Sequence, residues 1–595
     1  MSEHAAVIDH GVGLDRPTRY ALIALALAQA LALYALARAS DANVDLRWLY
    51  GGCALAGLLP PLFYLGCNRL YDWRNLVAAL LAGPLLFALG WHLGWLYGPA
   101  AAGSNPPDDF IFSFAASMGV AVFVLASYLR AWSAYRRPVF RYPELLLYTH
   151  EQLFSIVLVV VFSGIAWALL ALWAALFDAI GIRLFSWLFQ QPLFVWLCHG
   201  LIAGIALAVI RSQPRLIATL SAMSRALLRV LLVPVATAIL LFVLALPWVG
   251  LEPIWDTGQA ASLMMALSLV LLALFATAFL PDASDSGYPR PVRALIWLAV
   301  VILPINVALA AWALGLRIDQ HGLSVDRLWA AIMLAFIAAY ALGYALVILC
   351  SPTKASARLQ RINVVLGLVV AGTLILVNTP LADLRALSAH DQAQRLLQSR
   401  IAPERFDYAY LRRELGPYGM AELKRLRDSD FAAEHPAAAQ RIARVMKSPT
   451  AADPEPLLDT RDPEAVAAAF DIVPSDVRVP EQVAKLAVQA SPRCLRSPRQ
   501  CRLVQAVHAD MTFWWEITRS GGNNRYGTAF AEIDGRWRSV GSVVSRGCRD
   551  KPASADDDHT APRALGGPFV AFVDDHCIYV IDPSADFLTR RGALR

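Results

Sequence analysis

The sequence lacks the short motifs that mark several large classes of enzyme. It has no GxSxG, HExxH or Walker A pattern, so no nucleophile elbow, zinc-protease helix or phosphate-binding loop is indicated. CxxC and HxxxH spacings, which structural zinc sites often use, are missing as well. We therefore expect no metal and no cofactor, and we favour a protein that is not an enzyme.

Charged residues are scarce, at 16% of the chain, and unevenly distributed. From residue 380 onward 30 basic and 29 acidic residues almost cancel, so most of the net charge of +6 belongs to the part before it. There the basic residues stand between apolar segments, where membrane orientation and anionic lipid account for them. We therefore expect membrane lipids as partners and no nucleic acid.

Long apolar runs are what the sequence has in abundance. Eleven segments before residue 380 are long enough to cross a bilayer, which takes roughly 17 to 25 apolar residues. Backbone polar groups in hydrocarbon must be paired within the segment, so runs this rich in Leu and Ala predict helices. The predicted spans are 20–37, 48–66, 76–97, 110–129, 153–177, 193–210, 230–249, 260–280, 294–314, 328–349 and 362–377.

The basic residues between these spans fall mainly on one side. Seventeen Lys and Arg residues lie in one set of connections and five in the other, which is a strong positive-inside bias. The N-terminus is then cytoplasmic, and an odd number of crossings makes the tail extracytoplasmic. The first span also resembles a secretory signal, with Arg16 and Arg19 before it and small residues at 35–39; its cleavage would leave the later orientation unchanged.

We predict an all-α polytopic membrane bundle followed by an extracytoplasmic helical segment and a small α+β module. The bundle covers residues 1–379 and the helical segment 380–447, within which Gly416-Pro417 predicts a break. A linker rich in Pro, Asp and Ala covers 448–475 and the module covers 476–595. A separate short helix at the headgroup level is predicted from Tyr142 to Tyr148.

The last part of the chain has the pattern of a sheet. Runs at 512–518, 527–533, 536–543 and 569–581 predict strands. Asp534-Gly535, between the second and third runs, is a strong signal for a tight hairpin turn. The module is therefore built more like a binding or structural domain than like an enzyme with a deep pocket.

The eight cysteines form two groups. Four lie in or beside spans, and the other four all lie in the module, namely Cys494, Cys501, Cys548 and Cys577. An even set in an extracytoplasmic module predicts two disulfides, with three pairings open. A zinc site is the rival interpretation, without CxxC or HxxxH spacing to support it.

No Asp, Glu, Lys or Arg lies near the middle of any predicted span. Coupled transporters usually carry such groups to bind the driving ion or relay protons, so their absence disfavours that class. His92 and His199 are the histidines within spans. We interpret each as a helix-end residue bonded to a neighbouring carbonyl, and not as a ligand.

Four stretches have distinctive sequences: GLRIDQHGLSVDR at 315–327, NTPLAD at 378–383 followed by SAHDQ, RFDYAYL at 405–411 and GPYG at 416–419. In them the sequence resembles the bacterial inner-membrane family that carries domain of unknown function 4153. His321 stands where an aromatic residue is expected, which argues against a universal catalytic role there. The resemblance implies a multi-pass bacterial inner-membrane protein with a periplasmic tail, and no known reaction, substrate or cofactor.

The connection at 315–327 and the start of the tail lie on the same predicted face. Both carry charges of both signs, which predicts a fixed junction between bundle and tail. The residues assigned to this junction are Arg317, Asp319, Asp326, Arg327, Asp383 and Asp391, with Arg385 and Arg395 as further charges of the tail.

Three functions remain open. The first is a non-enzymatic envelope anchor whose periplasmic module binds a protein or a cell-wall component. The second is a transferase that uses a lipid-linked glycan or group donor, for which Asp41 and Asp45 after the first span are the weak catalytic candidates. The third is a transporter of lipid or a small molecule, with its substrate between helices kinked by proline.

Overall fold

The computed structural model forms two compact units, Met1–Thr450 and Ala451–Arg595. Each is described by itself below. The residues that the structure describes are 14–41, 44–69, 72–98, 109–135, 140–250, 260–282, 287–351, 354–447, 470–474, 477, 479–490, 501–508, 511–518, 526–533, 535–548, 563–565, 571–574 and 577–583.

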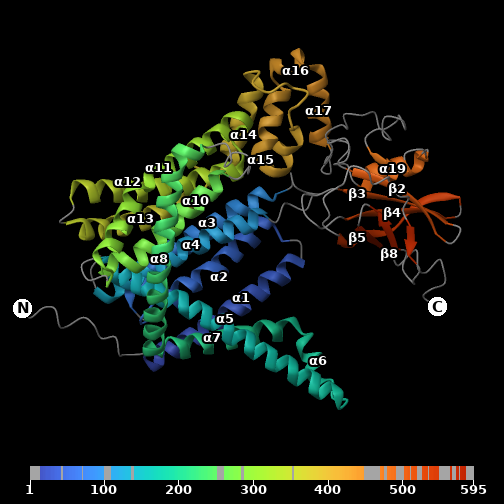
Figure 1. The fold of residues 1–595 in the computed structure, drawn as a ribbon. Helices are drawn as coiled ribbons and strands as arrows, with labels where there is room; N and C mark the ends of the chain where they lie inside the picture. Colours follow the sequence, from blue (N-terminus) through green and yellow to red (C-terminus); the bar gives the residue numbers. More distant parts are fainter. Residues whose placement is uncertain are drawn as a thin grey trace, which may run out of the picture. The chain divides into compact units, whose positions relative to one another are not determined.

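Eleven of the described helices are long and apolar enough to cross a membrane, which confirms the predicted polytopic bundle (Figure 1). The chain is a multi-pass membrane protein. The spans are α1 (Arg16–Asp41), α2 (Leu46–Gly66), α3 (Trp73–Leu96), α4 (Asp109–Tyr135), α5 (Tyr142–Ala179), α7 (Pro192–Ile210), α8 (Pro214–Val249), α10 (Ala260–Leu274) with the π-helical turn η2 (Phe275–Phe279), α11 (Arg290–His321), α12 (Val325–Cys350) and α13 (Ala355–Leu376).

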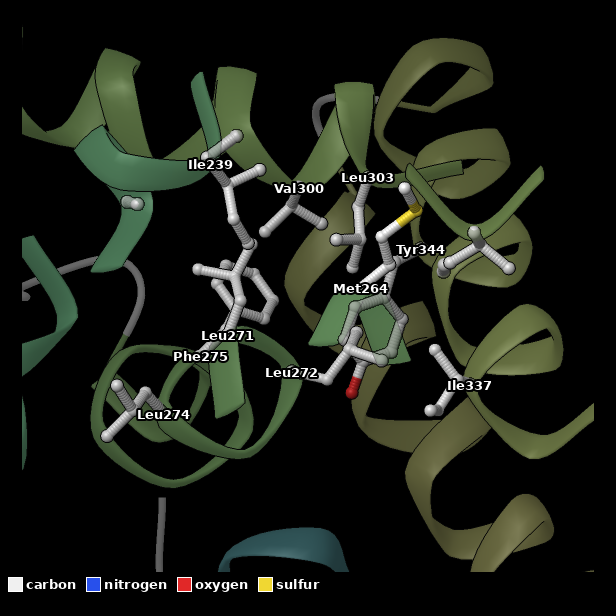
Figure 2. Packing of buried hydrophobic residues seen from close by; sticks show 14 of the residues in the cluster. Ile239, Met264, Leu271, Leu272, Leu274, Phe275, Val300, Leu303, Ile337 and Tyr344 are labelled. Atoms are coloured by element: carbon white, nitrogen blue, oxygen red, sulfur yellow. The ribbon is translucent and has the colours of Figure 1, made fainter. Parts of the chain in front are cut away.

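The largest buried cluster of the bundle lies among α8, α10, α11 and α12. Figure 2 shows Met264 and Leu272 of α10 beside Tyr344 of α12 within this cluster. Two buried polar residues of this region bond to each other: the Asn306 amide nitrogen donates to Ser268 Oγ at 2.8 Å and to the Met264 carbonyl at 3.0 Å. These bonds satisfy the nitrogen of the amide in hydrocarbon, whereas its Oδ1 has no hydrogen-bond partner in the described part of the chain.

The prediction of a separate headgroup helix at Tyr142 to Tyr148 is wrong, because α5 runs without interruption from Tyr142 to Ala179. Its polar first turns pack on α4. Arg130 of α4 lies 2.5 Å from Glu151, and Ser127 Oγ lies 3.0 Å from Thr149 Oγ1. These polar contacts hold the first turns of α5 against the bundle.

The helical segment after the last span consists of α14 (Leu384–Leu397), α15 (Tyr408–Arg427), α16 (Asp430–Glu434) and α17 (Pro436–Lys447) around a core of its own. Gly416 interrupts α15 with φ 54° and ψ −130°, a conformation that favours glycine. The predicted break at Gly416-Pro417 is therefore confirmed. A Cβ at Gly419 would lie 1.6 Å from the Leu411 carbonyl oxygen, so the two halves of α15 approach as closely as glycine permits.

The second unit contains one mixed sheet and the helix α19 (Glu481–Ala490). The strand order is β1-β2-β3-β4-β5-β8-β7-β6, and only β1 and β2 run parallel among the paired strands of the described residues. The strands are β1 (Asp471–Val473), β2 (Cys501–His508), β3 (Met511–Thr518), β4 (Tyr526–Ile533), β5 (Arg536–Cys548), β6 (Arg563–Leu565), β7 (Ala571–Asp574) and β8 (Cys577–Pro583).

Strands β3, β4 and β5 confirm three of the predicted strands, and Gly535 takes the positive φ of 71° that the predicted turn requires. The fourth predicted strand, 569–581, is wrong as a single element. It is the hairpin of β7 and β8, in which Asp574 pairs with Cys577. Strand β1 lies within the stretch assigned to the linker, whose residues 448–469 lie outside the described part.

Candidate functional site

The connection between α11 and α12 is much shorter than its sequence suggests. Helix α11 continues to His321, so Arg317 and Asp319 lie on its last turns and only three residues, 322–324, separate it from α12. Gly322 ends α11 with a positive φ of 76°, as glycine commonly does at this position. Ser324 begins α12 by accepting a hydrogen bond from the Arg327 backbone at 3.3 Å.

Arg395 of α14 completes the end of α11. Its Nη1 donates to the Asp319 carbonyl at 2.8 Å and its Nη2 donates to the Ile318 carbonyl at 2.9 Å. The last carbonyls of a helix lack intrahelical partners and carry the negative end of the helix dipole. A guanidinium therefore satisfies both the hydrogen bonds and the charge of this helix end.

The rest of this contact is also made to backbone groups. Asp391 Oδ2 accepts from the Leu323 amide at 2.8 Å and from Arg395 Nε at 3.0 Å. Ser388 Oγ and Gln392 Nε2 both donate to the Leu323 carbonyl, at 2.9 and 3.0 Å. Every polar group of the turn that faces α14 thus has a partner on it.

Only some of the six residues assigned to the junction from the sequence make contacts there. Asp391 binds the turn, and Arg327 Nη1 donates to the Gly322 carbonyl at 2.7 Å. For the side chains of Arg317, Asp319 and Asp326, no hydrogen bond or ion pair occurs within the described residues. The contact at this turn is formed by charged side chains and backbone groups, and not by opposite charges across the two elements.

Asp383 makes a second attachment, to α3. Its Oδ2 lies 2.9 Å from His92 Nε2, with side-chain exposures of 1% and 9%. Its Oδ1 accepts from the Arg385 amide at 2.9 Å and so caps α14. The interpretation of His92 as bonded to a neighbouring carbonyl is therefore wrong, because its partner is a carboxylate 291 residues away.

Aromatic rings surround the His92 and Asp383 pair. The His92 ring stacks on Trp95 with 5.7 Å between centroids, and Tyr418 of α15 meets Trp95 edge-on at 5.3 Å. Burial, with a smaller contribution from the Asp383 charge, raises the pKa of the Tyr418 phenol to about 12. The Arg385 guanidinium lies 3.9 Å from the centre of the Phe110 ring. The pair is thus covered on several sides.

A third attachment lies at the end of the last span. Asn378 Nδ2 donates to Ser117 Oγ of α4 at 2.9 Å and to the Leu374 carbonyl at 2.7 Å. The start of the helical segment is therefore held at α3, α4 and the turn between α11 and α12. We call these contacts the bundle junction, formed by His92, Ser117, Leu323, Asn378, Asp383, Ser388, Asp391, Gln392 and Arg395.

Asp41 and Asp45, the other sequence candidates, lie at helix ends. Asp45 caps α2 by accepting from the Arg47 amide at 2.9 Å, and Asp41 lies 3.6 Å from Arg38 with 69% of its side chain exposed. His199 lies within α7 and accepts from Trp167 Nε1 at 3.2 Å, so its interpretation as a helix-end residue bonded to a carbonyl is wrong. Among the residues that the structure describes, no group of three or more His, Cys, Asp or Glu is placed to hold a metal ion.

Of the four module cysteines, Cys548 and Cys577 occupy directly opposite positions on β5 and β8. Cys501 is buried at the start of β2, and Cys494 lies outside the described residues. The cysteines in or beside the spans, Cys53, Cys67, Cys198 and Cys350, are not in disulfides.

Comparison with known proteins gives one match. The family model described as Domain of unknown function (DUF4153) covers residues 25–426, from within α1 to the last turn of α15. No curated protein and no solved structure matches the chain. The matched region includes the membrane helices together with α14 and nearly all of α15, and therefore the whole bundle junction.

Proposed function

The chain belongs to the family of the domain of unknown function (DUF4153), and from this membership and the bundle junction we propose that it is an envelope anchor. In this proposal the membrane helices hold the helical segment 384–447 in one fixed position and present the C-terminal module to a partner. The partner is an envelope protein or a lipid-linked glycan. The role requires binding and no chemical step.

The observation that carries the proposal is the buried attachment of α14 at both of its ends. Asp383 at its start binds His92, and Arg395 at its last turn binds the end of α11. A segment that only followed the last span would not need buried polar partners on three other helices, because each buried polar group costs free energy unless it is paired. The family match extends to residue 426, about 50 residues beyond the last span, which supports treating α14 and α15 as part of the membrane domain.

We place the protein in the bacterial inner membrane with a cytoplasmic N-terminus and a periplasmic C-terminal module. The excess of basic residues on one side of the spans supports this orientation, and so do the facing positions of Cys548 and Cys577 in a module predicted to be on the oxidising side. Alkaline phosphatase fused after Lys447 should be active, and the same enzyme fused after Arg211 should be inactive. The reverse pattern would contradict the orientation.

Complementation of a strain that lacks the protein separates the anchor from the transferase. The anchor proposal expects loss of function in Asp391→Ala/Arg395→Ala and in a chain ending at Thr450, both with normal membrane levels. It expects full function in Asp41→Asn/Asp45→Asn, in which asparagine keeps the cap of α2. A transferase acting through the two aspartates would give the opposite result for the last variant.

A further inference from the structure

A cavity of about 680 Å³ lies between α4, α5, α10, α12 and α13 and is open on one side, where Phe112, Val120 and Met333 are exposed. Its walls are almost wholly apolar, and residues such as Phe112, Val120, Leu272, Trp329, Phe336 and Leu374 line it. An apolar cavity of this size among membrane helices is suited to a hydrocarbon ligand, since lipid and cavity wall are equally apolar and packing decides the fit.

The cavity is long. Trp329 and Tyr344 both line it from α12, and fifteen residues of helix correspond to about 22 Å. This length exceeds the hydrocarbon depth of one leaflet, about 15 Å, which is half of the whole core. An extended acyl chain therefore fits along the α12 wall.

One end of the cavity is polar, and one hydrogen-bond donor there is available to a ligand. Asn363 of α13 is only 8% exposed and lines the cavity. Its Oδ1 accepts from the Tyr344 hydroxyl, whereas its Nδ2 has no hydrogen-bond partner in the described part of the chain. The neighbouring Tyr142 hydroxyl donates to the Ala276 carbonyl at 2.8 Å and interacts with the Asn363 side chain. Since Nδ2 carries two hydrogens, at least one of them is left to bind an acceptor on a ligand.

The same end of the cavity lies close to basic residues. Arg358 and Arg361 precede Asn363 on α13, and Arg141 precedes Tyr142 at the start of α5. All three arginines are exposed. A phospholipid has matching parts in the same order, namely an anionic headgroup, ester carbonyl acceptors and then the chain.

We propose that the cavity binds one acyl chain of a phospholipid from the leaflet on the side of these arginines. The ester carbonyl accepts a hydrogen bond from Asn363 Nδ2, and the chain runs between α10, α12 and α13 toward Trp329. This site goes beyond the anchor role and does not depend on the bundle junction.

Another cavity of the bundle is a useful contrast. It has about 400 Å³ and lies against Gln29 and Tyr64. There the Gln29 amide donates to the Ala56 carbonyl at 3.0 Å and accepts from the Tyr64 hydroxyl at 2.8 Å. Its amide nitrogen and oxygen both have partners within the protein, so this cavity has no equivalent of Asn363.

Photo-crosslinking tests the proposal on the full chain in nanodiscs. The probe is phosphatidylglycerol with a diazirine in one acyl chain, and labelled positions are read by peptide mass spectrometry. We expect labelling of the cavity wall at the buried residues Ile337 and Leu272. Ala116→Phe/Ala273→Phe fills the cavity and should abolish this labelling, whereas Ala115→Phe, on the same helix but outside the cavity lining, should leave it unchanged.

Asn363→Leu tests the polar end. Labelling at Ile337 should fall by about fivefold, as expected for the loss of one hydrogen bond, and a diazirine-bearing alkane without an ester should label wild type and variant equally. Equal elution in size-exclusion chromatography controls for folding. Two results would overturn the site: labelling of the wild type only at lipid-exposed positions such as Leu342, or equal labelling of the wild type and the filled variant. Equal labelling of the wild type and Asn363→Leu would overturn the role of the amide.

Discussion

Nη1 of Arg395 lies 2.8 Å from the backbone oxygen of Asp319, so a side chain from beyond the last span completes the end of a membrane helix. Because the acceptors are backbone carbonyls, these bonds do not depend on which side chain stands at position 319. The bundle junction is therefore a property of the helix ends and of α14. Three substitutions probe how it is built, and one cysteine pair probes the module.

Arg395→Ala should release the end of α11. Loss of the two hydrogen bonds to the α11 carbonyls, together with the one to Asp391, is expected to cost about 2 kcal/mol. A broad-specificity protease should then cleave the connection between α14 and α15 about thirtyfold faster. Arg395→Lys should be intermediate, because an ammonium cannot form the paired bonds of a guanidinium. The exposed Arg400→Ala is the control, and equal cleavage of both alanine variants would refute the prediction.

Asp383→Ala should lower the free energy of unfolding in detergent by about 2 to 4 kcal/mol. Loss of the α14 cap accounts for about 1 kcal/mol, and a buried His92 without its partner accounts for about 1 to 3 kcal/mol more. Denaturant unfolding followed by tryptophan fluorescence measures the change. Asp45→Ala removes only an exposed cap on α2, so it should cost about 1 kcal/mol; losses of the same size in the two variants would show that the His92 contact contributes nothing.

Gly322→Ala should destabilise the turn between α11 and α12. Residue 322 has a positive φ of 76°, and a Cβ there would lie 2.6 Å from Gln392 Nε2, so we expect a loss of about 1 to 2 kcal/mol. Gly315→Ala lies within α11 with open space around its Cβ and should stabilise by about 0.5 to 1 kcal/mol. Changes of the same sign in the two variants would contradict the assignment of the turn.

Cys548 and Cys577 should form a disulfide in the protein isolated from membranes without reductant. Directly opposite residues of neighbouring antiparallel strands have Cα atoms about 4.5 to 5.5 Å apart, which is within the range for a disulfide. Mass spectrometry of non-reduced peptides should find this pair linked, with Cys53 and Cys198 as free thiols. Quantitative alkylation of Cys548 without reduction would refute both the pair and the oxidising location of the module.

The spans could be predicted because each depends on one measurable property, the length of an apolar run. The beginnings of α5 and α8 could not, since their first turns are polar enough to resemble connections and become helical through contacts with other helices. The turn at Gly322 was predicted too wide for a similar reason. The residues at 317–321 are compatible with a helix and with a connecting loop. Arg395 stabilises the helix by binding the carbonyls at its end.

The candidate site was predicted only in its location. The sequence indicates that Asp383 and Asp391 lie near the end of the last span, but it gives no distance between residues 291 positions apart. His92 had one signal, its place as a lone ionisable residue in an apolar run, and its partner could be any acidic residue on that face. Arg395 was expected only as one of the charges of the tail, and Tyr418 had no signal, because their roles depend on the length of α11 and on the bend at Gly416.

The two oxygens of the Asp383 carboxylate serve different helices, one capping α14 and the other meeting His92 of α3. A rotation of α14 that withdrew one oxygen would displace the other, so the two bonds are made and broken together. The start of α14 and its contact with the third span therefore depend on the orientation of a single carboxylate.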